Sequence, residues 1–173
     1  NLNDFVMDKA SLIILDEKCF SGANNLYSLK LISDSIIFAN SRIHSISLTK
    51  ISIQTKQNIF INSETFENCQ SLKELSISSS LNISVFKNAF SNSFSLKKVN
   101  FECNSVSIQN ESFIDCNNFK SFSLKAENEI VIHENTFINC SSLNDFIVDS
   151  SSSLFIYYKF TKSLIKTVCL SAK

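Results

Sequence analysis

Apolar residues recur along this chain at a nearly constant period, and phenylalanine marks the period most clearly. Phe20 lies two periods before Phe66, and the rest of the series follows at spacings of 24, 23, 24 and 23: Phe66, Phe90, Phe113, Phe137 and Phe160. A fixed period of this length is typical of solenoid proteins, in which each period is one structural unit.

Each period contains two short runs in which apolar and polar residues alternate. One run precedes the Phe, with the apolar pairs Ile13 and Leu15, Ile59 and Ile61, Ile83 and Val85, Val106 and Ile108, and Ile130 and Ile132. The other run follows a Leu or Phe six residues after the marker Phe, with the pairs Leu29 and Leu31, Leu75 and Ile77, Val99 and Phe101, Phe122 and Leu124, and Phe146 and Val148. Alternation at period two predicts a strand with one buried face, so each unit should hold two strands.

Neither strand can bury its apolar face alone, and stacking the units aligns their apolar columns into one core. The pattern therefore predicts a repeat solenoid of about seven coils of 23–24 residues, folded as a single domain over residues 1–173. Neighbouring coils should lie about 4.8 Å apart, which is the strand spacing of a parallel sheet.

The pattern departs from its period in two places. Ile43, Ile46 and Leu48 are predicted to start a strand too soon after Leu26 to fit the period, which makes 49–58 an irregular or extended connection and the first place to look for a specific contact. After Phe160 the sequence matches the repeat only loosely, and the apolar positions of the expected strand are Ile165, Val168 and Leu170. Residues 160–173 are therefore expected to form a degenerate C-terminal coil or cap.

The units "ETFENCQSLKELSIS" around Phe66 and "NTFINCSSLNDFIVD" around Phe137 resemble the BspA-type leucine-rich repeats, whose theme is A-F-x-x-C-x-x-L-x-x-I-x-I. The resemblance covers about residues 2–170. It implies a solenoid of the α/β horseshoe class, mostly β with short helical turns, and a parallel sheet on the concave face. The Pro usual after the first strand and the Gly usual before the A-F are missing here.

Members of that family are surface proteins of anaerobic bacteria and some protists, for which adhesion is proposed. The resemblance thus implies a non-enzymatic binding or adhesion module, at the cell surface or secreted, with protein or glycan partners. An intracellular, cytoplasmic scaffold is the alternative, which reduced cysteines would favour. Fold alone does not decide between these functions.

Composition narrows the range of partners. Sixteen Lys and Arg balance sixteen Asp and Glu, so no basic field attracts nucleic acid or an anionic membrane. No stretch approaches the ~18 apolar residues that a membrane span needs. We expect a fragment of a longer protein, joined to a membrane only through regions outside it. One Gly and no Pro leave the turns to Asn, Ser and Asp, which accept left-handed backbone geometry.

Cysteine and histidine are the residue types of this chain that are most able to bind a metal or to act in catalysis. Cys69, Cys116 and Cys140 stand three residues after their Phe, in a slot that also takes Ala or Ser, which predicts small, buried, reduced thiols. Without a C-x-x-C motif, and with only His44 and His133, we expect no metal, no cofactor and no catalytic residues. Glu64, Glu111 and Glu134 are expected to cap short helical turns.

The chain contains three N-x-S sequons, at Asn82, Asn110 and Asn139, and we expect all three to lie in connections. The Asn, Ser and Thr content alone predicts about as many sequons by chance. Alternation places the candidate partner-binding residues on the outward side of the concave strands. These residues are Ser28, Lys30, Ser45, Ser47, Glu74, Ser76, Lys98, Asn100, Ser121, Ser123, Asp145 and Ile147. This face is polar and lacks the Trp, Tyr and Arg typical of tight protein interfaces, so weak or multivalent contacts are expected.

Overall fold

The structure is a computed structural model that describes residues 3–17, 19–20, 23–40, 42–43, 45–157 and, by backbone alone, 167–172. Its strands among these residues are β1 (Asp4–Asp16), β2 (Ser28–Ala39), β3 (Lys50–Thr55), β4 (Ile59–Ile61), β5 (Glu74–Ser79), β6 (Asn82–Val85), β7 (Lys98–Cys103), β8 (Ser105–Ile108), β9 (Ser121–Ala126), β10 (Ile130–Ile132), β11 (Asp145–Ser150), β12 (Leu154–Ile156) and β13 (Thr167–Ala172).

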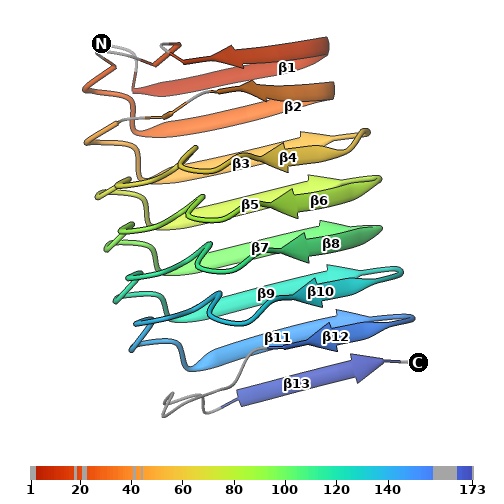
Figure 1. Ribbon diagram of the computed structural model, residues 1–173. Coiled ribbons are helices and arrows are strands. Elements are labelled where there is room, and N and C mark those ends of the chain that lie inside the picture. The colour runs from red at the N-terminus through yellow and green to blue at the C-terminus, as the bar shows by residue number, and fades with distance from the viewer. Residues whose placement is uncertain are drawn as a thin grey trace.

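Two parallel sheets form two sides of a stack of coils (Figure 1). The eight-stranded sheet, called the long sheet below, has the order β1-β2-β3-β5-β7-β9-β11-β13. The five-stranded sheet, called the return sheet, has the order β12-β10-β8-β6-β4. In the first two coils one long strand forms both sides. β1 and β2 bend at the corner, and their second halves lie on the side of the return sheet, where Ile14 pairs with Ile37. The described strands therefore make seven two-sided coils followed by β13, which confirms the predicted solenoid.

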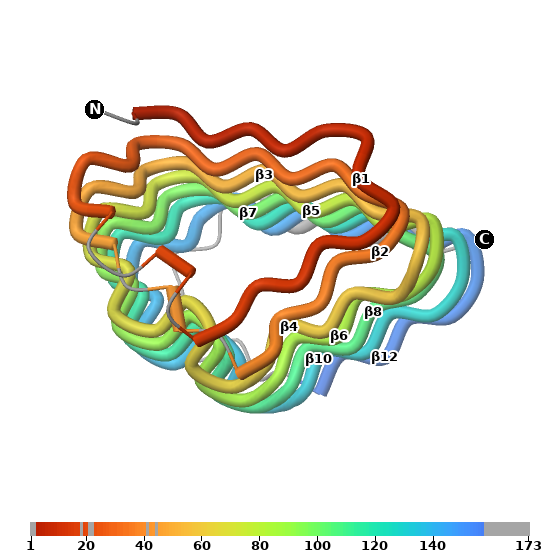
Figure 2. Tube along the Cα trace, turned by 90° about the horizontal axis from the view of Figure 1, so that it is seen from above, coloured from red at the N-terminus to blue at the C-terminus, as the bar shows by residue number. Residues whose placement is uncertain are grey.

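A third side closes each coil, and it is built differently from the predicted helical turns (Figure 2). Within the described residues there is no helix; instead, left-handed residues two before and two after Phe66, Phe90, Phe113 and Phe137 turn the chain. They are Glu64, Asn88, Glu111, Asn135, Asn68, Asn92, Asp115 and Asn139, with φ between 57° and 64°. The expectation that Glu64, Glu111 and Glu134 cap helical turns is therefore wrong.

Hydrogen bonds between neighbouring coils hold this third side together. The Phe66 and Phe90 amides donate to the carbonyls of Ala89 and Ser112 one coil further on, at 2.8 and 2.9 Å. A backbone that bonds to the next coil cannot also bond within a helical turn. The left-handed kinks point these amides along the stack, and Asn fills most of the kinks because its short polar side chain tolerates this geometry.

The core consists of columns, each made of the same position in successive coils. Phe66, Phe90, Phe113 and Phe137 stack with ring centroids 5.1, 4.9 and 5.6 Å apart and interplanar angles of 7°, 3° and 19°. All four rings are buried. The apolar pairs predicted for the two strands are likewise buried from Leu29 to Val148. The hydrophobic pattern of the sequence therefore identified the core correctly.

The third coil is regular, which corrects the prediction for this part of the chain. β3 is paired on both sides, with Ile51 opposite Leu29 and Leu75. Ile43 takes the marker Phe's place, since its amide donates to the Thr65 carbonyl at 2.8 Å. Ile46 is exposed. The segment from Ile43 to Leu48 is one residue shorter than its equivalent in the next coil, and this shortening made a connection look like a strand.

The last coil follows the predicted register as far as it is described. In β13, Val168 pairs with Phe146 and Leu170 with Val148. Phe160 and Ile165 lie outside the described residues, so the expectation of a degenerate cap stays a prediction.

The Phe column should dominate stability. Replacing Phe113 with Ala removes a buried ring that touches two stacked neighbours, and we expect a loss of about 3–5 kcal/mol in the free energy of unfolding. Phe155→Ala is the matched control, since that ring is exposed on the surface, and it should cost less than about 1 kcal/mol. Urea denaturation followed by circular dichroism measures both, and equal losses would contradict this assignment.

Candidate functional site

The outward face of the long sheet carries ten of the twelve residues predicted for partner binding. The pairing register aligns Ser28, Glu74, Lys98, Ser121 and Asp145 in one column across the strands. A second column holds Lys30, Ser76, Asn100, Ser123 and Ile147. Every one of these residues is exposed or half-buried. The structure therefore assembles them into one continuous surface, called the long face below.

Ser45 and Ser47 do not belong to the long face, which corrects their prediction. Both precede β3, and Ser45 is buried with its Oγ accepting a hydrogen bond from the Leu48 amide at 3.2 Å. Lys50 and Ser52 take the two places on the face, opposite Ser28 and Lys30. The apolar column could have revealed them, because Leu48 lies close to one period after Leu26 and one period before Leu72.

Charges on the long face alternate from coil to coil and compensate one another. Lys50 lies 3.5 Å from Glu74 in the first column, and Lys125 lies 3.8 Å from Glu102 in a third column. These pairs are exposed, so each contributes at most about 1 kcal/mol to stability. The result is a mixed polar surface without a strong field of either sign, which does not attract nucleic acid.

Two shallow grooves lie at the corner between the long sheet and the return strands. The larger has a volume of about 510 Å³ and is lined by Asp8, Lys9, Ala10, Ser11, Ile32, Ser33, Asp34, Gln54, Thr55, Lys56, Ser78 and Ser80. The smaller, of about 280 Å³, continues from Ser78 and Ser80 to Glu102, Asn104 and Lys125. Hydroxyl, amide and charged groups border both, so the corner extends the polar long face rather than forming an apolar ligand pocket.

The slot three residues after the marker Phe holds small hydrogen-bond donors, not merely small side chains. The Cys69, Cys116 and Cys140 thiols donate to the carbonyls of Ile43, Phe90 and Phe113 in the preceding coil, at 3.2, 3.2 and 3.1 Å. The Ser93 hydroxyl donates to Phe66 in the same way at 3.0 Å. Cys and Ser therefore interchange because each offers one donor in a buried site, a reason that the sequence did not reveal.

The described cysteines are free, and the buried ones are poor nucleophiles. Burial raises the pKa of Cys69 and of Cys103 to about 12. A side-chain hydrogen bond with Cys140, together with burial, holds the pKa of Cys116 well above its ordinary value. Because a thiolate is the reactive form, these cysteines act as structural groups.

A model of the BspA-type leucine-rich repeat region matches the chain in six copies, over residues 1–120 and 38–167. This chain belongs to the BspA-type leucine-rich repeat family. No curated protein and no solved structure matches it. The family supports a repeat-based protein-interaction module, and a solenoid of this kind is typically a non-enzymatic scaffold.

The structure explains how these BspA-type repeats manage without the usual Gly before the Phe. The position two before Phe66, Phe90, Phe113 and Phe137 is left-handed, a geometry that Gly adopts without strain. Here Asn88 and Asn135 fill it at little cost, while Glu64 and Glu111 fill it with longer side chains. Both glutamates form ion pairs with the preceding coil, to Arg42 and to Lys87 respectively.

Histidine is not brought together with cysteine in the part of this BspA-type solenoid that the structure describes. The His133 ring lies at the surface and stacks on Tyr157 with centroids 6.1 Å apart, whereas Cys116 and Cys140 are buried in the core. His44 lies outside the described residues. Among the described residues, no group of three or more His, Cys, Asp or Glu could hold a metal ion.

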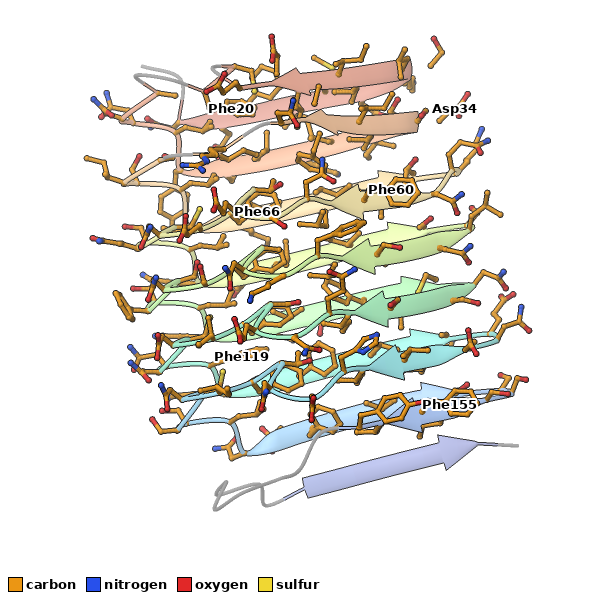
Figure 3. All side chains as sticks on the ribbon, viewed as in Figure 1. Phe20, Asp34, Phe60, Phe66, Phe119 and Phe155 are labelled. Carbon is orange, nitrogen blue, oxygen red and sulfur yellow. The ribbon has the colours of Figure 1, made fainter. Side chains whose placement is uncertain are left out.

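Apolar surface gathers on the other side of the molecule. The central outward column of the return strands consists of Ile14 and Ile37 and then, across a hollow between β2 and β4, of Phe60, Ser84, Ser107, Val131 and Phe155. Figure 3 shows Phe60 and Phe155 at separate levels of this side. Together with the outward residues on either side of this column, it is called the return face below.

The three sequons fall at different sites in this fold. Asn82 is exposed and begins β6, so the expectation that all three lie in connections is wrong for it. Asn139 is exposed at a left-handed turn and donates to the Asp115 carboxylate at 2.7 Å. Asn110 is half-buried in a connection. In the described part of the chain, no helix is long and apolar enough to cross a bilayer.

Thiol labelling should separate the buried cysteines from the exposed one. With iodoacetamide at pH 8, native protein should be alkylated at Cys19, which is exposed, and protected at Cys69, Cys103 and Cys116, because the reagent does not reach buried thiols. Labelling in urea should reach all four. Peptide mass spectrometry identifies each site, and native labelling of Cys116 as fast as Cys19 would be incompatible with a buried slot.

Proposed function

We propose that this domain is a non-enzymatic binding module of a surface-exposed protein that presents the long face to protein or glycan partners. One observation carries the proposal: an eight-stranded sheet whose outward side chains stand in straight, polar columns. The family itself supports a repeat-based interaction module. Adhesion at a cell surface goes beyond the family and is part of the proposal.

The spacing of the long face suits a repetitive partner. Neighbouring strands lie about 4.8 Å apart, and outward residues of one strand lie about 7 Å apart, so the face is a regular grid of hydroxyl, amide and charged groups. Ser76, Asn100 and Ser123 form its centre. Such groups hydrogen-bond readily to sugar hydroxyls or to a peptide backbone.

Single contacts on this face should be weak. It carries Ile147 and Val6 as exposed apolar residues but no aromatic anchor among the described outward positions, and its charges are already paired in part. Presentation of many copies on one surface would supply avidity that a single face lacks. A surface protein offers such multiplicity.

The test uses beads coated with the domain, incubated with a defined glycan array and with a panel of purified matrix proteins. The variant Lys30→Ser, Lys98→Ser, Asn100→Ser strips the long face, and Asn117→Ser, which changes an exposed residue outside both faces, is the matched control. We expect at least one probe to bind the wild type and the control, and to bind the triple variant about tenfold less. Equal binding by all three proteins, or by none, would refute the proposal.

An intracellular scaffold is the second candidate, and the free thiols of the described cysteines favour it, since disulfides are rare in reducing compartments. Sequon occupancy in the native protein distinguishes the two. A surface protein of a glycosylating cell should carry a glycan at Asn139, which is exposed on the third side, while an intracellular protein should carry none. Glycopeptide mass spectrometry before and after treatment with a glycosidase measures this, and an occupied sequon would eliminate the scaffold.

A further inference from the structure

The return face differs from the long face in having an apolar patch at each end, with Ser84 and Ser107 between the two patches. Ile14 is 57% exposed, Phe60 is 50% exposed and Phe155 is 44% exposed, all in its central column. Beside Phe155, Tyr157 is 59% exposed and stacks on His133. Isolated exposed apolar residues are common in soluble proteins, but a contiguous patch of them marks an interaction site.

Charge is almost absent from this surface. Its three outward columns, which span seven coils, contain only two ionisable acids or bases besides His133: Asp16 and Glu129. The long face, by contrast, carries a charge on most strands. Depletion of charged residues with enrichment of aromatic ones is the compositional mark of a protein–protein interface core.

From these observations we propose that two copies of this chain associate through their return faces. The central column is apolar at both ends, with Ile14 and Ile37 at one and Val131 and Phe155 at the other, and Ser84 lies at its midpoint. A two-fold axis that runs parallel to the strands through β6 reverses the order of the coils in the second copy. The Ile14 end of one copy therefore packs against the Phe155 end of the other. Self-complementarity of this kind is what an isologous dimer needs.

The same axis matches side chains in size and polarity. Phe60 faces the small Ser107, so a large residue meets a small one, and Ile37 faces Val131. Asp16 faces Tyr157, whose hydroxyl can donate to the carboxylate. No two like charges meet, because Glu129 faces Ser35. Sheets that pack face to face lie about 10 Å apart, and these side chains fill such a space.

A hollow in the return face provides a socket for this packing. It lies where β2 passes β4, has a volume of about 570 Å³, and is bordered by Ile37 and Phe60 with Asn58 and Asn62 at its rim. Val131 of the second copy would face it. The strand spacings give the whole return face an area of about 550 Å² per copy, against the ~800 Å² of a standard interface. An interface of this size belongs to the weak, transient class, so the dimer should form reversibly.

Sedimentation equilibrium over a range of concentrations tests the proposal. We expect a reversible monomer–dimer equilibrium in the wild type, with at least tenfold weaker dimerisation in Phe60→Ser and in Phe155→Ser. Serine already occupies this column at 84 and 107, so both variants should fold. The control is Ile147→Ser, an equally exposed apolar residue on the long face, which should dimerise like the wild type.

Three results would overturn the proposal: a monomer at every concentration, a dimer that both return-face variants leave intact, or a series of larger species indicating association end to end through β1. The orientation has its own test, in a background lacking Cys19 and Cys169. A short bis-maleimide should link Ile14→Cys protein to Phe155→Cys protein and should link neither to itself. Self-linking of Phe155→Cys protein would contradict the axis along the strands.

Discussion

Hydrogen bonding between equivalent residues of successive coils constrains everything else in this molecule. Parallel strands in register place each residue directly over its equivalent, about 4.8 Å away. A core side chain is therefore favoured where it packs well against the same position of the neighbouring coils. Phenylalanine meets this demand by offset stacking, and the rings of Phe66, Phe90 and Phe113 are almost parallel at the spacing that the backbone imposes. The marker Phe that makes the repeat visible is thus a consequence of the backbone ladder.

The same constraint governs the polar positions. On the third side, left-handed residues turn the amides of Phe66 and Phe90 along the stack, where they bond to the next coil. The buried slot after the Phe must then offer a donor to the preceding coil, which Cys116 and Ser93 both do. Which residue type can occupy a column therefore depends on hydrogen bonding as much as on side-chain volume.

Periodicity allowed the sequence to predict the solenoid, the core columns and most of the long face, because alternation fixes which side of a strand is buried. It failed at Ile43, where an aliphatic residue replaces the marker Phe and the following connection loses a residue. It also failed to predict the left-handed third side, since Glu64 and Glu111 are typical helix formers that only the coil-to-coil hydrogen bonds force into this geometry.

The two outward faces are therefore under different physical demands. Columns of like charge would repel along the stack, so the long face alternates Lys50 with Glu74 and stays solvated. The return face avoids the problem by carrying almost no charge, at the cost of exposing Phe60 and Phe155. Covering these rings with a second copy would leave two long faces pointing in opposite directions. A dimer of this geometry bridges two partners instead of binding one twice, so self-association on one face determines how binding on the other face can be used.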